Sequence, residues 1–243
     1  AFEPLPDWLR KGGYQEIERP YILKAYENEE NRARAEALAY ESDVVIIGSA
    51  SEKLVRRRLR ENKITFHYSE RWFKTGYHSL LSPRAWCYFY RNHIRYRNKR
   101  SYMLCASAFT ATDVRKVFAY PGKCFKWGYF TRVDDFNLEA SLAAKRGNTR
   151  IMWCARFLDW KHPELPVKLA RRLKDSGYNF QLNMYGSGVE LERTKELVEK
   201  LKVEDVVAFK GNLPNEEILR EMRGHNIFLF TSDRNEGWGA VLN

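Results

Sequence analysis

Two basic residues near the middle of the 243-residue chain have the spacing of an anion-binding pair. Arg156 and Lys161 are five residues apart and directly follow a short apolar segment. Two cations on one loop can clamp a diphosphate through charge-assisted hydrogen bonds. The sequence therefore predicts an anion site on this loop.

Three further loops in the C-terminal part of the chain carry residues suited to a polar ligand. Gly186 and Gly188 precede a predicted helix, whose N-terminus favours an anionic or polar group. The turn at Phe209–Pro214 offers backbone groups, and the last loop places Glu236 beside flexible backbone amides. A carboxylate next to amides is suited to sugar hydroxyls and phosphate oxygens. Each loop alone is also compatible with an ordinary turn, so their joint occurrence carries the prediction.

Each of these four loops follows a segment that we expect to be a strand. The expected strands are 150–155, 179–185, 206–209 and 227–230, and the expected helices between them are 163–176, 190–201 and 215–223. Strands that alternate with helices of about ten residues indicate a parallel sheet. Ligands of such sheets bind beyond the carboxyl ends of the strands, so the four loops should share one edge.

The same alternation occurs in the first half of the chain. Expected strands are 43–48, 64–67, 102–105 and 123–127, and expected helices are 21–42, 51–60 and 109–117. The length and β-branched residues of 43–48 favour a buried strand. Residues 1–20 are typical of a loop, and residues 69–100 should be helical in parts, with breaks near Gly76 and Pro83. We therefore predict an α/β protein with two Rossmann-like lobes, residues 1–148 and 149–243, each with a parallel sheet.

Composition excludes several classes of protein. Hydrophobic residues make up 44% of the chain, but no segment approaches the roughly 18 apolar residues of a membrane-spanning helix. The four cysteines lie far apart without a C-x-x-C pair, which argues against a zinc ribbon or a disulfide scaffold and favours a reducing compartment. No G-x-G-x-x-G follows the first expected strand, which argues against a nicotinamide-dependent oxidoreductase.

The positive charge of the chain is concentrated in one stretch. Residues 51–100 carry 14 basic and three acidic residues, an excess equal to the net charge of +11 of the whole chain. The stretch includes Arg56–Arg58 and Arg91–Arg100, with aromatic residues between them. It has three interpretations: a solvated helix face in which arginine stems cover aromatic rings, an anionic membrane surface, or nucleic acid.

Several motifs in order resemble one enzyme family. The segment Asn226–Asn243 resembles the signature of the retaining GT-B glycosyltransferases of family 4, in which an apolar strand leads to an E-G-F/W-G loop and then to a helix, expected here from Gly239. Cys154–Arg156 with Lys161, Tyr185–Gly188, and Val207–Gly211 with Pro214 are similar in order and spacing. The resemblance covers about 150–243 well and 43–135 more loosely.

The resemblance implies a fold, a reaction and a donor. The fold would be of the GT-B type, with two Rossmann-like lobes that are both incomplete in this chain. The enzyme would move a hexose from a UDP- or GDP-linked donor to an acceptor hydroxyl with retained configuration, in surface polysaccharide or glycolipid biosynthesis. Such enzymes use no metal cofactor, because the arginine and the lysine take its place.

The resemblance also assigns roles to residues. Arg156 and Lys161 would bind the diphosphate, Glu236 would contact donor-sugar hydroxyls, and His67 would face the donor sugar, so His67 and Glu236 are the expected catalytic residues. The remaining expected donor-binding residues are Gly186, Gly188, Phe209, Gly211, Leu213, Gly237, Trp238 and Gly239.

The expected partners are a nucleotide sugar and a saccharide or lipid-linked acceptor. We expect a cytoplasmic protein whose basic first lobe lies on the anionic inner face of the membrane, and no nucleic-acid partner. The family motif has a second glutamate that would fall at position 244, and the usual first strand is absent before Ala1. The resemblance therefore implies a fragment of a longer enzyme, with little activity on its own.

Overall fold

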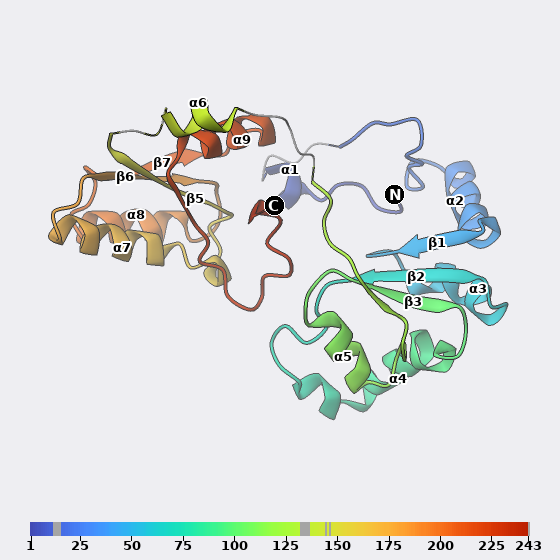
Figure 1. Cartoon of the computed structure of the whole chain (residues 1–243). Helices are drawn as coiled ribbons and strands as arrows, with labels where there is room; N and C mark the ends of the chain where they lie inside the picture. The colour runs from blue at the N-terminus through green and yellow to red at the C-terminus, as the bar shows by residue number, and fades with distance from the viewer. Residues whose placement is uncertain (12–15, 132–136, 144, 146, 243) are drawn as a thin grey trace. The chain divides into compact units, whose positions relative to one another are not determined.

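The computed structural model describes residues 1–11, 16–131, 137–143, 145 and 147–242, and the chain forms two compact units (Figure 1). The first unit consists of Ala1–Pro4, Glu18–Arg132 and Arg234–Asn243, and the second of Leu5–Ile17 and Val133–Asp233. The predicted division into functional lobes at 148/149 stays a prediction. Among the described residues, no helix combines the length and apolarity that crossing a bilayer requires.

The first unit contains a four-stranded parallel sheet in the order β1-β2-β3-β4. Its strands are β1 (Val44–Ile47), β2 (Ile64–Ser69), β3 (Ser101–Cys105) and β4 (Cys124–Lys126). All four strands were predicted, and the parallel pairing confirms the prediction from their alternation with helices. The register places His67 between Ile47 of β1 and Met103 of β3.

Short helices and turns connect the strands of this sheet or flank it. They are α2 (Glu29–Glu41), α3 (Arg56–Arg60), α4 (Pro83–Asn92) and α5 (Thr110–Lys116), with 3-10 turns η1 (Glu52–Val55), η2 (His78–Leu81) and η3 (Ile94–Tyr96). Met103 on β3 packs with Phe89 of α4 and Val114 of α5 in one buried cluster. α4 begins at the predicted break, because the Ser82 side chain caps it by accepting a hydrogen bond from the Ala85 amide.

The helix predicted over 21–42 is wrong in its first eight residues. α2 begins at Glu29, where the Asn28 side chain accepts a hydrogen bond of 2.7 Å from the Asn31 amide. Before it, the Ala25 amide donates to the carbonyl oxygen of Ala1, 24 residues away, at 2.7 Å. Because that amide is used in a long-range contact, residues 21–28 form turns rather than helix.

Two expectations about burial in the first unit are wrong. β1 was predicted to be a buried strand, but Val44 and Ile46 are 48% and 57% exposed because β1 lies at the edge of the sheet. Arg58 was predicted to belong to the basic surface, but its side chain is fully buried. Its guanidinium donates to the Thr65 hydroxyl and to the carbonyl oxygens of Ala39, Tyr40, Ser42, Asp43 and Ile64.

The second unit contains a parallel sheet in the order β7-β6-β5-β8. Its strands are β5 (Thr149–Cys154), β6 (Phe180–Tyr185), β7 (Val207–Gly211) and β8 (Ile227–Leu229). The first strand in sequence, β5, therefore lies between β6 and the last strand, β8. The strand order reverses at β5, and such a switch point is where open parallel sheets bind ligands.

The helices of the second unit cover both faces of its sheet. The main helices are α7 (Glu164–Asp175), α8 (Leu191–Lys200) and α9 (Asn215–Gly224). In Figure 1, α7 and α8 lie on one side of the sheet and α9 on the other. Trp153 and Leu182 of the sheet pack with Val167 of α7 and Val198 of α8 in a single buried core.

Several short elements were not predicted. α1 (Asp7–Lys11) and α6 (Leu138–Ala143) belong to the second unit, together with the 3-10 turn η4 (Asp159–Lys161). The helix expected from Gly239 is represented by the 3-10 turn η5 (Ala240–Leu242), and Asn243 lies outside the described residues.

Candidate functional site

The candidate site is the carboxyl edge of the second sheet, at the switch point between β5 and β8. The loop after β5 carries Arg156 and Lys161, and Lys161 ends the turn η4. Both side chains are half-buried. Burial, and then the positive charge of Arg156, lower the pKa of Lys161 below its ordinary value. The two cations therefore lie close enough for their charges to interact.

The loop after β6 that contains Gly186 and Gly188, called the glycine loop below, contacts the loop that carries Arg156. The Phe157 amide donates to the carbonyl oxygen of Ser187 at 2.8 Å. A Cβ added at Gly186 would lie 2.0 Å from the carbonyl oxygen of Ala155, and one at Gly188 would lie 2.3 Å from that of Phe157. Their φ angles of +127° and +151° are also rare for residues with a side chain. Only glycine allows the two loops to approach this closely.

The turn after β7 joins the same cluster of loops. The Gly186 amide donates to the carbonyl oxygen of Gly211 at 2.8 Å, and the Asn212 side chain donates to the Ser187 hydroxyl at 2.8 Å. Phe209 packs against Phe157, with ring centroids 6.1 Å apart. Leu213 follows in the same turn and is half-buried. The structure thus brings three of the four predicted loops together.

A chain of hydrogen bonds connects the core of the second unit to Lys161. The indole Nε1 of Trp153 donates to the Thr231 hydroxyl at 2.8 Å, and that hydroxyl donates to the carbonyl oxygen of Lys161 at 2.5 Å. Trp153 lies on β5 and Thr231 follows β8. Because these strands are neighbours, the two hydrogen bonds tie the backbone at Lys161 to both β5 and the segment after β8.

Sequence reasoning missed His162, which lies among the same loops. Its Nδ1 lies 3.3 Å from a carboxylate oxygen of Glu164, and its Nε2 lies 3.6 Å from one of Asp233. The Asp233 amide also donates to the carbonyl oxygen of Trp160 at 3.0 Å. His162 and Asp233 are 71 positions apart in the sequence, so only the pairing of β5 with β8 brings them together.

The expected sugar-binding segment, Glu236–Gly239, groups with the first unit. The ring of Trp238 packs on Tyr129 at a centroid distance of 6.0 Å, and a Cβ added at Gly237 would overlap the Glu70 carboxylate. Glu236 is half-buried, and Gly239 is buried. The roles that the resemblance assigns to these residues stay predictions.

The carboxylate that faces Gly237 is held by two hydrogen bonds. Lys74 and the Tyr129 hydroxyl donate to Glu70, each at 2.7 Å. Burial raises the pKa of Glu70, but these hydrogen bonds and the charge of Lys74 outweigh burial and bring the pKa below its ordinary value. Glu70 is therefore an ionised group at neutral pH.

His67, the other expected catalytic residue, is buried within β2, with 3% of its surface exposed. Its Nδ1 lies 3.3 Å from a carboxylate oxygen of Glu52, and its ring packs edge-on against His93 at 5.3 Å between centroids. Burial, and then the charge of His67, lower the pKa of His93 to about 3. The role of His67 toward a donor sugar stays a prediction.

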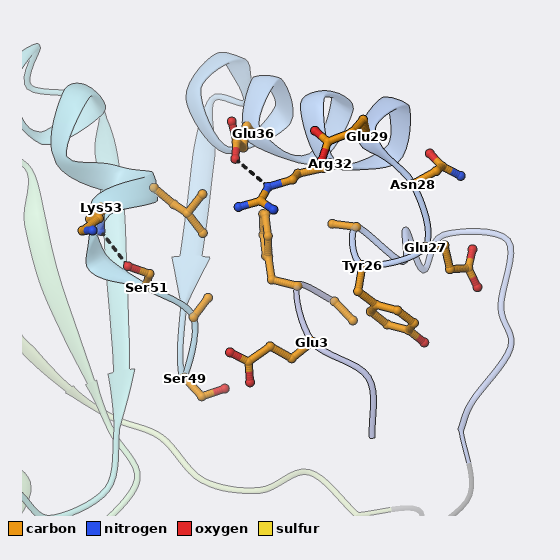
Figure 2. Close-up of a pocket in the computed structure, with 15 residues that line it drawn as sticks. Glu3, Tyr26, Glu27, Asn28, Glu29, Arg32, Glu36, Ser49, Ser51 and Lys53 are labelled. Carbon is orange, nitrogen blue, oxygen red and sulfur yellow. Dashed lines mark hydrogen bonds and ion pairs between the residues drawn. The ribbon is translucent and has the colours of Figure 1, made fainter. Parts of the chain in front are cut away.

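Two cavities lie away from the predicted residues. One of about 1040 Å³ in the first unit borders the loop after β1 and the N-terminal part of α2, and Figure 2 shows Ser49, Ser51 and Arg32 on its wall. Another of about 450 Å³ in the second unit is lined mainly by residues of α7 and α8 and also by Asp159. Sequence patterns gave no signal for either, because side chains from several elements form each wall.

The family comparison addresses the part of the chain that includes the candidate site. Residues 134–243 match the model of the family described as glycosyl transferases group 1. The chain is also 29% identical over 82 residues to the putative colanic acid biosynthesis glycosyltransferase WcaL of Escherichia coli (strain K12). That match covers 34% of this chain and 20% of WcaL.

Solved structures of glycosyltransferases share the fold. HepE of Anabaena in complex with UDP aligns with a TM-score of 0.58 at 12% identity, covering 84% of this chain and 57% of HepE. The pneumococcal O-GlcNAc transferase GtfA in complex with UDP and GlcNAc aligns at 0.56 and 15%, covering 84% and 40%. The lipopolysaccharide outer core galactosyltransferase WaaB aligns at 0.53 and 17%, covering 84% and 56%.

These similarities confirm the prediction of a GT-B α/β fold with two Rossmann-like lobes. At identities of 12–17% they show the fold alone. The chain spans a fifth of the length of WcaL and between 40% and 57% of the lengths of the three solved structures.

Proposed function

We propose that the protein transfers a hexose from a UDP- or GDP-linked donor to an acceptor hydroxyl, with retained configuration. The observation that carries the proposal is the pair Arg156 and Lys161, held at the switch point of the second sheet by the glycine loop. The similarity of residues 134–243 to the group 1 glycosyltransferases supports it.

The chemistry follows from the charges of this pair. Breaking the bond between the sugar and the diphosphate leaves negative charge on the nucleotide. Two preorganised cations stabilise that charge as it develops, which is the role of a metal ion in other phosphate chemistry. We propose that transfer requires no metal at this position. Glu236 would contact donor-sugar hydroxyls, and His67 would act near the sugar, as the resemblance implies.

The product class of the reaction is also a proposal. WcaL is described as a colanic acid biosynthesis enzyme, and WaaB as a lipopolysaccharide outer core galactosyltransferase. These relatives support a saccharide or lipid-linked acceptor, in surface polysaccharide or glycolipid synthesis, on the cytoplasmic side of a membrane.

Nucleotide binding tests the donor site. UDP and GDP are titrated calorimetrically into the unaltered chain, Arg156→Ala, Lys161→Ala and the control Arg172→Ala. Arg172 is an exposed arginine of α7 in the same unit. Loss of one charge-assisted contact should cost about 1.5–3 kcal/mol, or about 10- to 150-fold in affinity.

The control separates a site from general electrostatics. Arg172→Ala removes the same charge from the same unit, so it should leave the affinity unchanged. Equal affinities of both site variants and the unaltered chain would remove the diphosphate assignment. An equal loss in all three variants would indicate an unspecific effect of charge.

The first unit offers a surface for an anionic membrane. Around α4, the basic residues Arg84, Arg91, Arg95, Arg97, Lys99 and Arg100 are exposed. Leu81, Tyr88 and Tyr90 in the same stretch are also exposed, at 86%, 51% and 58%. Cations attract acidic lipids, and tyrosines are suited to the membrane interface. We propose that this surface binds the anionic inner face of the membrane.

Vesicle sedimentation tests this surface against nucleic acid at one salt concentration. Anionic vesicles should bind the chain, and neutral vesicles should not. The double variant Arg95→Gln with Arg97→Gln should weaken binding by about 2 kcal/mol, or roughly 30-fold, and Lys168→Gln with Arg172→Gln in the second unit should not. Tighter binding of DNA or RNA, with a steep salt dependence, would favour a nucleic-acid partner instead.

A further inference from the structure

Three side chains that are distant in sequence converge inside the first unit. Glu52 begins η1, His67 lies in the middle of β2, and His93 follows the last residue of α4. One potential ligand atom of each residue lies within 4.8 Å of those of the other two. Both histidines are buried, with 3% and 4% of their surfaces exposed. The cluster involves none of the residues on the carboxyl edge of the second sheet.

The chemistry of the three donors is that of a zinc site. Two imidazoles and one carboxylate form a common set of protein ligands for zinc, with a fourth position for water. The Nδ1 of His67 lies 3.3 Å from Oε1 of Glu52. Two ligands at zinc distances of about 2.0–2.1 Å in a tetrahedron are about 3.4 Å apart, so these two already have the right separation.

Two buried polar atoms in the cluster lack hydrogen-bond partners. Within the part of the chain that the structure describes, neither Nε2 of His67 nor Oε2 of Glu52 has one. Buried polar atoms are nearly always paired in folded proteins, so each exception calls for an explanation. An ion bound to Glu52 and to Nδ1 of His67 would account for the buried Oε2 of Glu52, whereas Nε2 of His67 would keep no partner among the described residues.

The Tyr120 hydroxyl contacts His93, the third proposed ligand, and orients its ring. The Tyr120 hydroxyl lies 2.6 Å from Nδ1 of His93, and Tyr120 is 1% exposed. Histidines that bind metals usually donate their other ring N–H to such a partner, which fixes the ring and the tautomer. With Nδ1 engaged by Tyr120, Nε2 is the nitrogen that His93 can offer to an ion.

Charge and access are compatible with a cation. Glu52 supplies one negative charge to the cluster. Arg56 is a positive charge nearby, and its guanidinium donates to Asn92 Oδ1 at 3.0 Å. The Glu52 side chain is 17% exposed, which gives a route from solvent. Its neighbours Ser51 and Lys53 line the cavity shown in Figure 2, so the route begins at an open part of the surface.

We propose that Glu52, His67 and His93 form a zinc site that stabilises the first unit. The site connects η1, β2 and the end of α4, which are separate elements of that unit. The site lies apart from Arg156 and Lys161, but it uses His67, and a zinc-bound His67 would not also act near the donor sugar. The zinc proposal is therefore independent of the diphosphate site but replaces the role that the resemblance implies for His67.

Zinc titration in the absence of nucleotide tests the site. The full chain is stripped with a chelator, dialysed and titrated calorimetrically with ZnCl₂, and cobalt(II) is used as a spectroscopic substitute. We expect one Zn²⁺ per chain, visible cobalt absorption typical of tetrahedral coordination, and a higher melting temperature with zinc.

Four variants locate the ion. Glu52→Gln and His67→Gln should each lose stoichiometric binding. His78→Gln, an exposed histidine of the same unit, should bind as the unaltered chain does. Tyr120→Phe keeps the ring and removes only the hydroxyl that contacts His93, so zinc binding should weaken by about 10- to 100-fold. Circular dichroism verifies the fold of each variant.

Clear results would overturn the proposal. If the unaltered chain binds no zinc, the cluster is a hydrogen-bonded network only. If Glu52→Gln and Tyr120→Phe both bind zinc as tightly as the unaltered chain, the ion is held elsewhere. Glu52→Gln replaces one carboxylate oxygen by an amide nitrogen and Tyr120→Phe removes one hydroxyl, so these two decide the question even if His67→Gln fails to fold.

Discussion

The substitution Gly186→Ala tests whether contact between two loops builds the donor site. Gly186 has a φ of +127°, and a Cβ there would lie 2.0 Å from the carbonyl oxygen of Ala155. That carbonyl belongs to the residue before Arg156. Backbone atoms cannot rotate away as a side-chain tip can, so the loop that carries Arg156 must move.

The expected magnitude has two parts. Forcing a residue with a Cβ into a rarely populated backbone conformation costs about 1–3 kcal/mol. Overpacking against a fixed neighbour costs about 1–3 kcal/mol more. Together they predict a loss of about 4 kcal/mol in the free energy of unfolding. A displacement of about 1 Å at a catalytic group can cost about 100-fold in rate, so nucleotide affinity and transfer should both fall.

Gly177→Ala is the matched control. Gly177 follows α7 in the same unit, has a φ of +73°, and has no described atom within 4 Å of an added Cβ. Its substitution should cost only the left-handed conformation, about 1–2 kcal/mol. Urea unfolding followed by tryptophan fluorescence measures stability, and calorimetric titration with UDP and GDP measures affinity.

The two variants should therefore differ in both measurements. Gly177→Ala should lose some stability and keep its nucleotide affinity. Gly186→Ala should lose more stability, and its nucleotide affinity should fall as well. Equal unfolding free energies and equal affinities would refute the reasoning, because they would show that the loops do not approach as closely as the structure has them.

Three further predictions concern the same site. Thr231→Val removes the hydroxyl that accepts from the Trp153 indole and should lower the free energy of unfolding in urea by about 1–3 kcal/mol. Thr231→Ser keeps a hydroxyl and should be nearly neutral. Similar losses in both variants would exclude the hydroxyl as the cause. Transfer should persist when EDTA is added to the assay, and restoration of lost activity by Mg²⁺ or Mn²⁺ would contradict the cationic clamp. Burial and Arg156 lower the pKa of Lys161, and bound diphosphate favours its protonated form. Nucleotide affinity should therefore fall as the pH rises through that lowered pKa, and Lys161→Arg, which stays charged, should abolish the fall; an unchanged profile in Lys161→Arg would exclude Lys161.

The sequence predicted those parts of the candidate site that depend on residues close together in the chain. Arg156 and Lys161 follow a recognisable strand, and the glycines after β6 are visible as a motif. The sequence could not show why the glycines are needed, since the reason is the backbone of another loop 31 residues earlier, at Ala155.

Burial of charged residues was the least predictable feature. Arg58 belongs to a run of three arginines, and the same run has an exposed member, Arg57, which stacks on Tyr40 at 3.8 Å. The two differ because the Arg58 guanidinium donates to the carbonyl groups of Ala39, Tyr40 and Ser42 at the end of α2, which satisfy it. Charge composition alone does not distinguish these environments.

The sequence by itself determined the strands, most of the helices and their parallel arrangement, because hydrophobic periodicity and glycine positions act over a few neighbouring residues. The tertiary structure alone decided the order β7-β6-β5-β8, and with it the contact between Thr231 and Lys161, 70 positions apart. It also decided the convergence of Glu52, His67 and His93. Such contacts depend on which strands become neighbours in the packed core, and no local pattern encodes that choice.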